Sequence, residues 1–310
     1  MKEEAKNYLA HLAEQMNVPH IIEAFKQDYT YSDNLKISLD ILETDFNAPT
    51  VVFIPGAAVY ALCYAEIMTK LGEAGYNVIG FDPRGHGKSE GRRGDYIFEE
   101  LVRDTQAVIT YAIENYSGEV SIMGAKQGGI VALHVAAADD RIQSAICYNL
   151  ADMSDPLSKQ LQLFPRKSTR LVSPILFGLS DIFPNLSLRV SRYAKFSNRK
   201  VRHFGNAQEF VKQDPLVLKK IKIKALKSFA HARLAREIDE ISTPVFVLQP
   251  EQDEIFPIEY TQKIFDKLKC KKRLEIFEGL NDMMMIENAN ELSPSIVSWL
   301  SDIHSRNSIN

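Results

Sequence analysis

Cysteine is scarce in this chain of 310 residues, which contains only Cys63, Cys147 and Cys270. These three are odd in number, far apart and without paired spacing, which argues against a disulfide framework or a zinc site and favours a reducing compartment. No apolar run is long enough to cross a bilayer, and the first residues lack the apolar segment of a secretion signal. We therefore expect a soluble cytoplasmic protein that needs no metal and no cofactor.

Charge is unevenly distributed along the chain, although the net charge is only −3. Residues 154–236 contain 18 lysines and arginines against four acidic residues, and the remainder contains 19 basic and 36 acidic residues. A basic block on an acidic body indicates an anionic ligand or surface, or else the docking of the block onto the body. The sequence leaves both explanations open, and we expect no nucleic-acid partner. It gives no indication of the oligomeric state.

The order of apolar segments predicts an α/β fold with a mostly parallel, doubly wound sheet. Phe25–Tyr31 and Leu35–Leu42 alternate apolar and polar residues, which is typical of an antiparallel strand pair. Buried strands then alternate with helices, both before and after the basic block. We expect a core formed by residues 1–153 and 237–310, interrupted by a mainly helical cap at residues 154–236. A short amphipathic helix is expected at Ala5–Met16.

The segment Ser121–Gly129 has the pattern of a nucleophile elbow, a strained turn between a strand and a helix that carries a catalytic serine. Gly124 and Gly128 flank the central position, where missing side chains let strand and helix approach closely. The central position, however, holds Lys126. The function therefore depends on the role of this lysine.

The segment Phe81–Gly91, with the sequence FDPRGHGKSEG, is similar to the D-x-R-G-H-G-x-S-x-G loop of the α/β-hydrolase superfamily. Together with the elbow and the cap position, it resembles the branch of monoacylglycerol lipases, lysophospholipases and serine aminopeptidase-type enzymes. The resemblance implies an α/β-hydrolase fold with an inserted cap. It also places Lys126 at the nucleophile position and Asp253 at the acid position. The histidine position holds Asp282, or Asn281 if the loop is one residue shorter.

The resemblance further implies an oxyanion hole, a pair of backbone N–H donors that holds a developing negative charge. Its donors would be the N–H groups of Ala57 and Gln127. Backbone donors do not depend on the side chains of the catalytic triad, so a carboxylate or enolate could still bind there. A serine hydrolase, by contrast, needs a hydroxyl nucleophile and a neutral imidazole, and both are missing at the expected positions.

Three hypotheses follow for the candidate site of Lys126, Asp253 and Asp282. The first is a pseudohydrolase, in which the lysine and the aspartates form an ion-pair cluster that serves binding or scaffolding. The second is a non-hydrolytic enzyme, such as a decarboxylase, lyase or isomerase, that uses Lys126 as a cation or a Schiff base. The third is a hydrolase of esters or thioesters in which Asp282 activates a water molecule. The sequence does not decide between an enzyme and a binding protein.

The cap gives only a weak indication of the substrate. Apolar segments at Leu161–Pro165 and Leu171–Phe183 are interspersed with Arg166, Lys167 and Arg170. This mixture is compatible with an acyl ligand that carries an anionic head group, or with a peripheral contact to an acidic membrane. Ordinary packing explains the apolar residues equally well.

Overall fold

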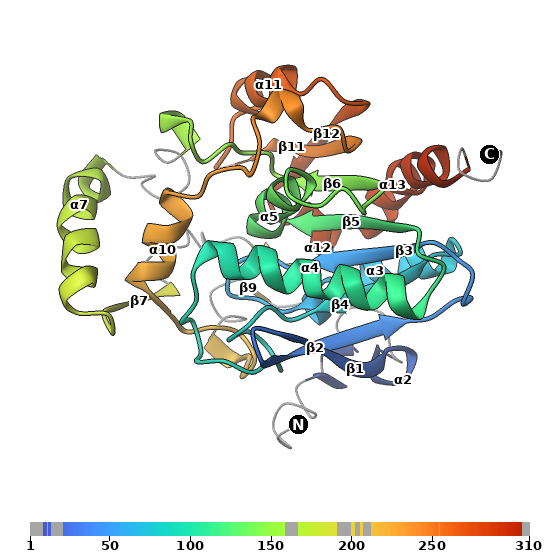
Figure 1. Ribbon diagram of the computed structural model, residues 1–310, viewed down its shortest axis with the longest axis horizontal. Coiled ribbons are helices and arrows are strands. Elements are labelled where there is room, and N and C mark those ends of the chain that lie inside the picture. The colour runs from blue at the N-terminus through green and yellow to red at the C-terminus, as the bar shows by residue number, and fades with distance from the viewer. Residues whose placement is uncertain are drawn as a thin grey trace.

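The computed structural model contains one large mixed sheet with helices on both faces (Figure 1). It describes residues 9–10, 12–13, 21–158, 167–190, 200–201, 205–206, 212–253 and 255–305. Most of the predicted helix at Ala5–Met16 lies outside these residues, as do Leu161–Pro165 and Arg166 of the cap. The side chains of Lys167 and Arg170 also lie outside the description.

The central sheet has eight strands in the order β1-β2-β4-β3-β5-β6-β11-β12. Strands β1 and β2 are antiparallel, and so are β2 and β4, whereas the other neighbours are parallel. This arrangement confirms the predicted antiparallel pair and the mostly parallel sheet. The strands are β1 (Lys26–Ser32), β2 (Leu35–Leu42), β3 (Thr50–Ile54), β4 (Asn77–Phe81), β5 (Val120–Ala125), β6 (Ser144–Tyr148), β11 (Val245–Gln252) and β12 (Lys272–Asn281).

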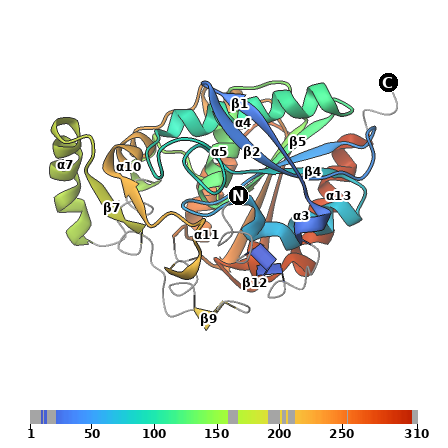
Figure 2. The same ribbon diagram turned by 90° about the horizontal axis from the view of Figure 1, so that it is seen from below.

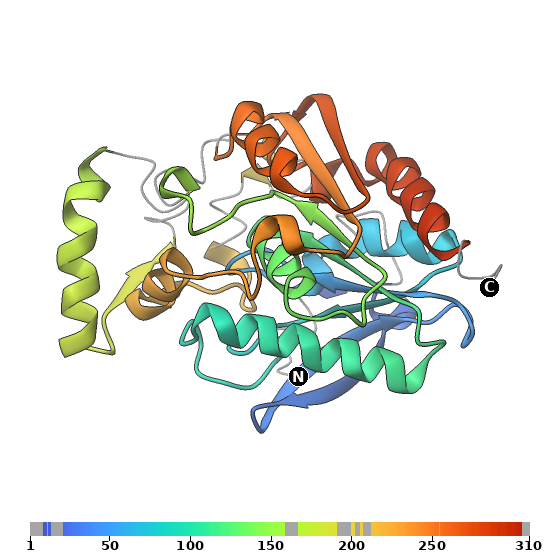
Figure 3. The ribbon, with the colours of Figure 1, turned by 45° about the horizontal axis from the view of Figure 1, so that its top comes forward.

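Helices cover both faces of this sheet, with α4 and α5 on one face and α3 and α13 on the other (Figure 1, Figure 3). A 3-10 turn at Ala61–Tyr64 precedes α3. The helices of the core are α2 (Ile21–Ala24), α3 (Ala65–Glu73), α4 (Phe98–Asn115), α5 (Gln127–Ala136), α11 (Ile258–Lys267), α12 (Met284–Glu287) and α13 (Ala289–His304).

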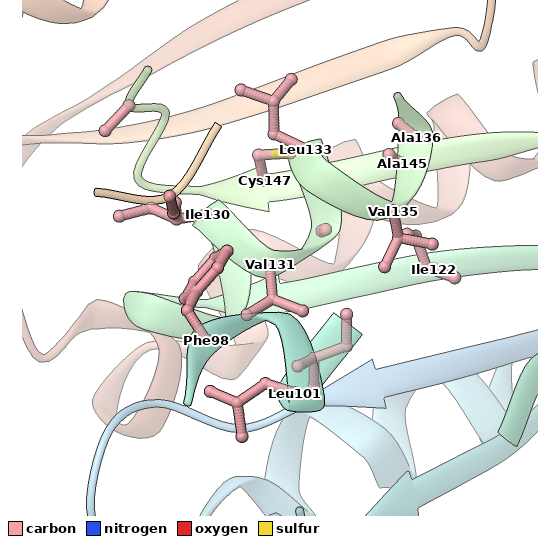
Figure 4. Packing of buried hydrophobic residues seen from close by; sticks show 14 of the residues in the cluster. Phe98, Leu101, Ile122, Ile130, Val131, Leu133, Val135, Ala136, Ala145 and Cys147 are labelled. Atoms are coloured by element: carbon pink, nitrogen blue, oxygen red, sulfur yellow. The ribbon is translucent and has the colours of Figure 1, made fainter. Parts of the chain in front are cut away.

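Two apolar clusters form the core, one on each face of the sheet. Successive residues of a strand point to opposite faces, so Ile122 joins the cluster under α4 and α5 whereas Met123 joins the cluster under α3 and α13. Figure 4 shows the first cluster, where Phe98 and Leu101 of α4 lie beside Val131 of α5. Burial on both faces explains why the central strands are apolar throughout.

The loop that follows β4 has a structural role. Its Arg84 is buried and donates from Nη2 to Asp104 Oδ1 at 2.6 Å. Burial lowers the pKa of His86 to about 4, so this imidazole is neutral near pH 7. The side chains of the loop thus anchor it to the core.

The described part of residues 154–236 contains two helices. It also contains two small sheets, which the sequence did not predict. Backbone N–H of Leu218 donates to the carbonyl of Ala58 at 2.8 Å, and Tyr60 Oη donates to Asp214 Oδ2 at 2.9 Å. Since Ala58 and Tyr60 follow β3, this segment lies beside the carboxyl end of that strand. Its elements are α7 (Lys167–Ile182), β7 (Ser187–Arg189), β8 (Lys200–Val201), β9 (Gly205–Asn206), β10 (Lys220–Lys222) and α10 (Ile223–Ala230).

Candidate functional site

Lys126 occupies a strained turn between β5 and α5, with φ 55° and ψ −114°. Left-handed backbone costs a residue other than glycine about 1 kcal/mol or more, so the surrounding structure must impose it. A Cβ on Gly124 would lie 2.0 Å from the carbonyl oxygen of Gly128, and a Cβ on Gly128 would lie 2.3 Å from that of Ile54. The turn therefore keeps the geometry of a nucleophile elbow although it carries a lysine.

The ammonium of Lys126 forms an ion pair with Asp282. Its Nζ donates to Asp282 Oδ2 at 3.1 Å and lies 3.9 Å from the sulfur of Met283. The Lys126 side chain is 29% exposed and that of Asp282 is 15% exposed, so the pair is only partly shielded from water. Tyr148 Oη donates to the backbone carbonyl of Asp282 at 2.6 Å, which fixes the loop after β12.

Asn281, the alternative residue at the histidine position, has a different role. Its Oδ1 accepts a hydrogen bond from the backbone N–H of Met283 at 2.8 Å, which closes a local turn. Of the two candidates, Asp282 is thus the residue that meets Lys126.

Asp253 is held beside this pair by hydrogen bonds and lies outside the ion pair. Its Oδ1 accepts from the N–H groups of Ile255 and Phe256 at 2.7 and 2.9 Å, and its Oδ2 accepts from Asn149 Nδ2 at 2.7 Å. Burial raises the pKa of the Asp253 carboxyl, while these hydrogen bonds and the charge of Lys126 act in the opposite direction. The described ion pairs include Lys126 with Asp282 but not Lys126 with Asp253.

The two expected oxyanion donors lie in loops that touch each other. A Cβ on Gly56 would lie 3.7 Å from the Cβ of Lys126, so the loop that carries Ala57 packs against the elbow. Gln127 is the first residue of α5, where backbone N–H groups have no partner within the helix. Within the described part of the chain, the N–H groups of Ala57 and Gln127 donate no hydrogen bond. Among these residues, nothing therefore competes with a ligand oxygen for the two amides.

A serine, a histidine and a glutamate meet elsewhere in the molecule, and sequence reasoning missed this group. His304 Nε2 lies 3.1 Å from Ser121 Oγ, and His304 Nδ1 lies 3.4 Å from Glu119 Oε2. Ser121 is fully buried between two neighbouring strands, at the start of β5 and far along the strand from the elbow. Because no substrate carbonyl can reach a fully buried hydroxyl, this group ties α13 to the sheet. Ser121 and His304 are 183 residues apart in the sequence, so no local sequence pattern indicated their contact.

A cavity of about 340 Å³ lies at the opposite end of the sheet from Lys126. It is formed by the loops that precede β6, β11 and β12 together with the end of α13, and so it does not belong to the elbow site. Within the described residues, no group of three or more His, Cys, Asp or Glu side chains is arranged to hold a metal ion.

Comparison with known proteins identifies proteins that are similar to this chain over most of its length. The family model described as serine aminopeptidase, S33, matches residues 47–289. The uncharacterized protein YqkD of Bacillus subtilis is 24% identical over 259 residues, which cover 82% of this chain and 72% of that protein. All candidate site residues lie within the range that the family model matches.

Solved structures show the same fold. The monoacylglycerol lipase of Paleococcus ferrophilus is similar with a TM-score of 0.66 and 23% identity, over 86% of this chain and 98% of that one. The α/β-hydrolase GrgF from Penicillium sp. sh18 is similar with a TM-score of 0.70 and 18% identity, over 90% and 99% of the two chains. Because these sequence identities are low, the structural similarity establishes only that the chain has the α/β-hydrolase fold.

Proposed function

The chain belongs to the serine aminopeptidase S33 family of α/β-hydrolase-fold proteins, and we propose that it uses the elbow as a binding site for an acyl-type anionic ligand. The observation that carries this proposal is the ion pair of Lys126 and Asp282 at the two positions that resemblance assigns to the nucleophile and the histidine. In this proposal the protein is a pseudohydrolase with a degenerate catalytic triad.

Side-chain chemistry argues against hydrolysis through a serine triad. That mechanism needs a hydroxyl that attacks the acyl carbon and an imidazole that takes its proton and later protonates the leaving group. An ammonium in an ion pair has no lone pair with which to attack, and a carboxylate that accepts its hydrogen bond cannot replace the imidazole at both steps. The site retains the means to hold an acyl group without the means to cleave it.

The available backbone amides supply the proposed ligand contacts. An acyl oxygen would accept hydrogen bonds from the N–H groups of Ala57 and Gln127, where the positive end of the α5 dipole also favours negative charge. The charges of Lys126 and Asp282 neutralise each other. A ligand carboxylate can therefore pair with the Lys126 ammonium only in competition with the Asp282 carboxylate. The proposal therefore makes Asp282 a competitor of the ligand for Lys126.

The same ion pair disfavours both alternative hypotheses. A Schiff base requires Lys126 to lose its proton, which contact with an ionised carboxylate opposes. Activation of water by Asp282 would have to use its Oδ1, because Oδ2 already accepts from Lys126. Borohydride trapping with oxo acids tests the first alternative, since an adduct at Lys126 would support it. Loss of ester turnover in Asp282→Asn would support the second.

Calorimetric titration with octanoate, with 1-octanol as the uncharged control, tests the proposed function. We expect Lys126→Met to weaken octanoate binding about tenfold, or about 1.4 kcal/mol. We expect Asp282→Asn to strengthen it, because that substitution removes the competing anion but keeps the ammonium. Equal affinity of the parent protein and Lys126→Met would contradict the proposal. So would the absence of octanoate binding to the parent protein.

A further inference from the structure

Helix α7 exposes a continuous apolar face. Nine large apolar side chains are exposed in the described part of the protein, and four of them belong to α7 or directly follow it. These four side chains are spaced four, three and one residues apart along the sequence, and this spacing places them on one side of a helix. The exposed fractions are 64% for Ile175, 37% for Leu179, 70% for Ile182 and 58% for Phe183.

Other side chains of α7 hold the helix on the protein. Leu176 and Phe177 are partly buried against the core cluster, and Asp181 forms an ion pair with Lys227 of α10 at 2.6 Å. Figure 1 and Figure 2 both show α7 at the edge of the molecule farthest from the C-terminus, beside α10. These contacts do not use the four exposed apolar side chains.

Positive side chains border this apolar face. The chain continues from α7 into β7, which pairs with β10 so that Arg189 lies opposite Lys220 and Ser187 lies opposite Lys222. Leu188 and Ile221 of the same strands pack on the core, so the alternation of strand residues directs the three cations outward. Lys222 Nζ donates to Asn185 Oδ1 at 2.8 Å, which places it close to the end of α7.

The charge of this strand pair is not compensated within the described residues. Arg189 and Lys220 are exposed, and like charges directly opposite each other on paired strands repel. The nearby acids Asp95 and Asp181 are already paired, with Lys224 and Lys227. An external anionic surface would relieve the repulsion.

We propose that α7 and the β7–β10 pair form a surface that binds an anionic lipid membrane. Ile175, Leu179, Ile182 and Phe183 enter the boundary between head groups and acyl chains, as the apolar face of an interfacial helix does. The outward cations of the strand pair, Arg189, Lys220 and Lys222, contact lipid phosphates. No helix in the described part of the chain is long and apolar enough to cross a membrane, so the contact is peripheral.

Electrostatics favours a membrane over a second copy of this chain. A symmetric dimer through this face would bring the same patch of each copy together and would set its cations close to their own equivalents. A membrane with acidic head groups offers opposite charge beside an apolar layer, which matches both halves of the surface. The proposal does not depend on the role of Lys126.

Sedimentation with lipid vesicles tests the proposal on the full-length protein. The probes are vesicles of phosphatidylcholine alone and vesicles with about one third phosphatidylglycerol. We expect at least about tenfold tighter binding to the acidic vesicles, and weaker binding when salt rises from about 0.1 M to about 1 M. Ile175→Ser/Ile182→Ser and Arg189→Gln/Lys220→Gln should each reduce binding about tenfold.

Tyr31→Ser/Phe46→Ser is the matched control, because it removes two equally exposed apolar side chains, 61% and 63% exposed, outside this surface. It should bind acidic vesicles as the parent protein does, and all variants should keep the parent melting temperature. Equal binding by the parent and the Ile175→Ser/Ile182→Ser variant would overturn the proposal, as would no binding at all. Dimerisation that this variant abolishes would instead assign the face to a second copy.

Discussion

The ammonium of Lys126 lies 3.1 Å from the carboxylate of Asp282, across a turn whose backbone retains the strain of a nucleophile elbow. We propose that these two positions correspond to those of the nucleophile and the histidine in the family. Their replacement by residues of opposite charge leaves the pair neutral, whereas either replacement alone would leave an uncompensated charge at a partly buried position. The two departures from the triad are therefore best explained together.

A double-mutant cycle of Lys126→Met and Asp282→Asn measures the strength of this pair. Because the Lys126 side chain is 29% exposed, we expect a coupling free energy of only about 1 kcal/mol in urea unfolding. The exposed pair of Lys70 and Glu73, 2.8 Å apart on α3, serves as the control and should give a smaller value. Independent effects of the two substitutions at the elbow would show that the ion pair contributes nothing to stability.

Gly128→Ala should destabilise the fold by several kcal/mol, because its Cβ would lie 2.3 Å from the backbone oxygen of Ile54. Gly178→Ala in α7 is the control, since no atom lies within 4 Å of its Cβ position. Higher helix propensity should make that control neutral or more stable by up to about 1 kcal/mol. Thermal unfolding of both variants checks the expectation, and an unaffected Gly128→Ala protein would refute the close packing of β3 and α5.

The stability of the protein should fall as the pH decreases from about 6.5 to about 4. Burial lowers the pKa of His134 to about 4, so the unfolded chain binds a proton in this range before the folded chain does. Neutral His134 makes its full contribution to the free energy of unfolding above pH 6.5. This contribution, about 3 kcal/mol, is lost as the pH falls toward 4. His86 has the same direction of shift and adds to the effect.

His134→Gln should therefore reduce the slope of unfolding free energy against pH over this range, whereas His231→Gln, at an exposed position, serves as the control. Urea unfolding at several pH values provides the measurement. Parallel curves for the parent protein and His134→Gln would mean that the burial of this imidazole does not affect proton binding.

The alternation of apolar segments was sufficient to predict the sheet and its main helices. Helix α4 spans Phe98–Asn115, and its apolar positions recur with the helical period along its whole length. The strand pairs β7–β10 and β8–β9 were not predicted, since strands of two or three residues leave no recognisable period.

The partners of the site residues were less predictable than their positions. The family resemblance assigned Asp253 and Asp282 to the same site as Lys126. It did not indicate that Asn149 and two backbone N–H groups would donate to the Asp253 carboxylate. Those contacts depend on the conformation of the loop after β11. The contact of Ser121 with His304 likewise depends on tertiary packing of α13 against the sheet.

Rebuilding the triad tests most directly whether Lys126 and Asp282 occupy the nucleophile and histidine positions. The measurement is the intact mass after treatment with a fluorophosphonate, which labels an activated serine. We expect no adduct on the parent protein or on Lys126→Ser alone, and an adduct at residue 126 in Lys126→Ser/Asp282→His, where Asp253 can orient the new imidazole. An adduct on the parent protein, or none on the double variant, would contradict the account.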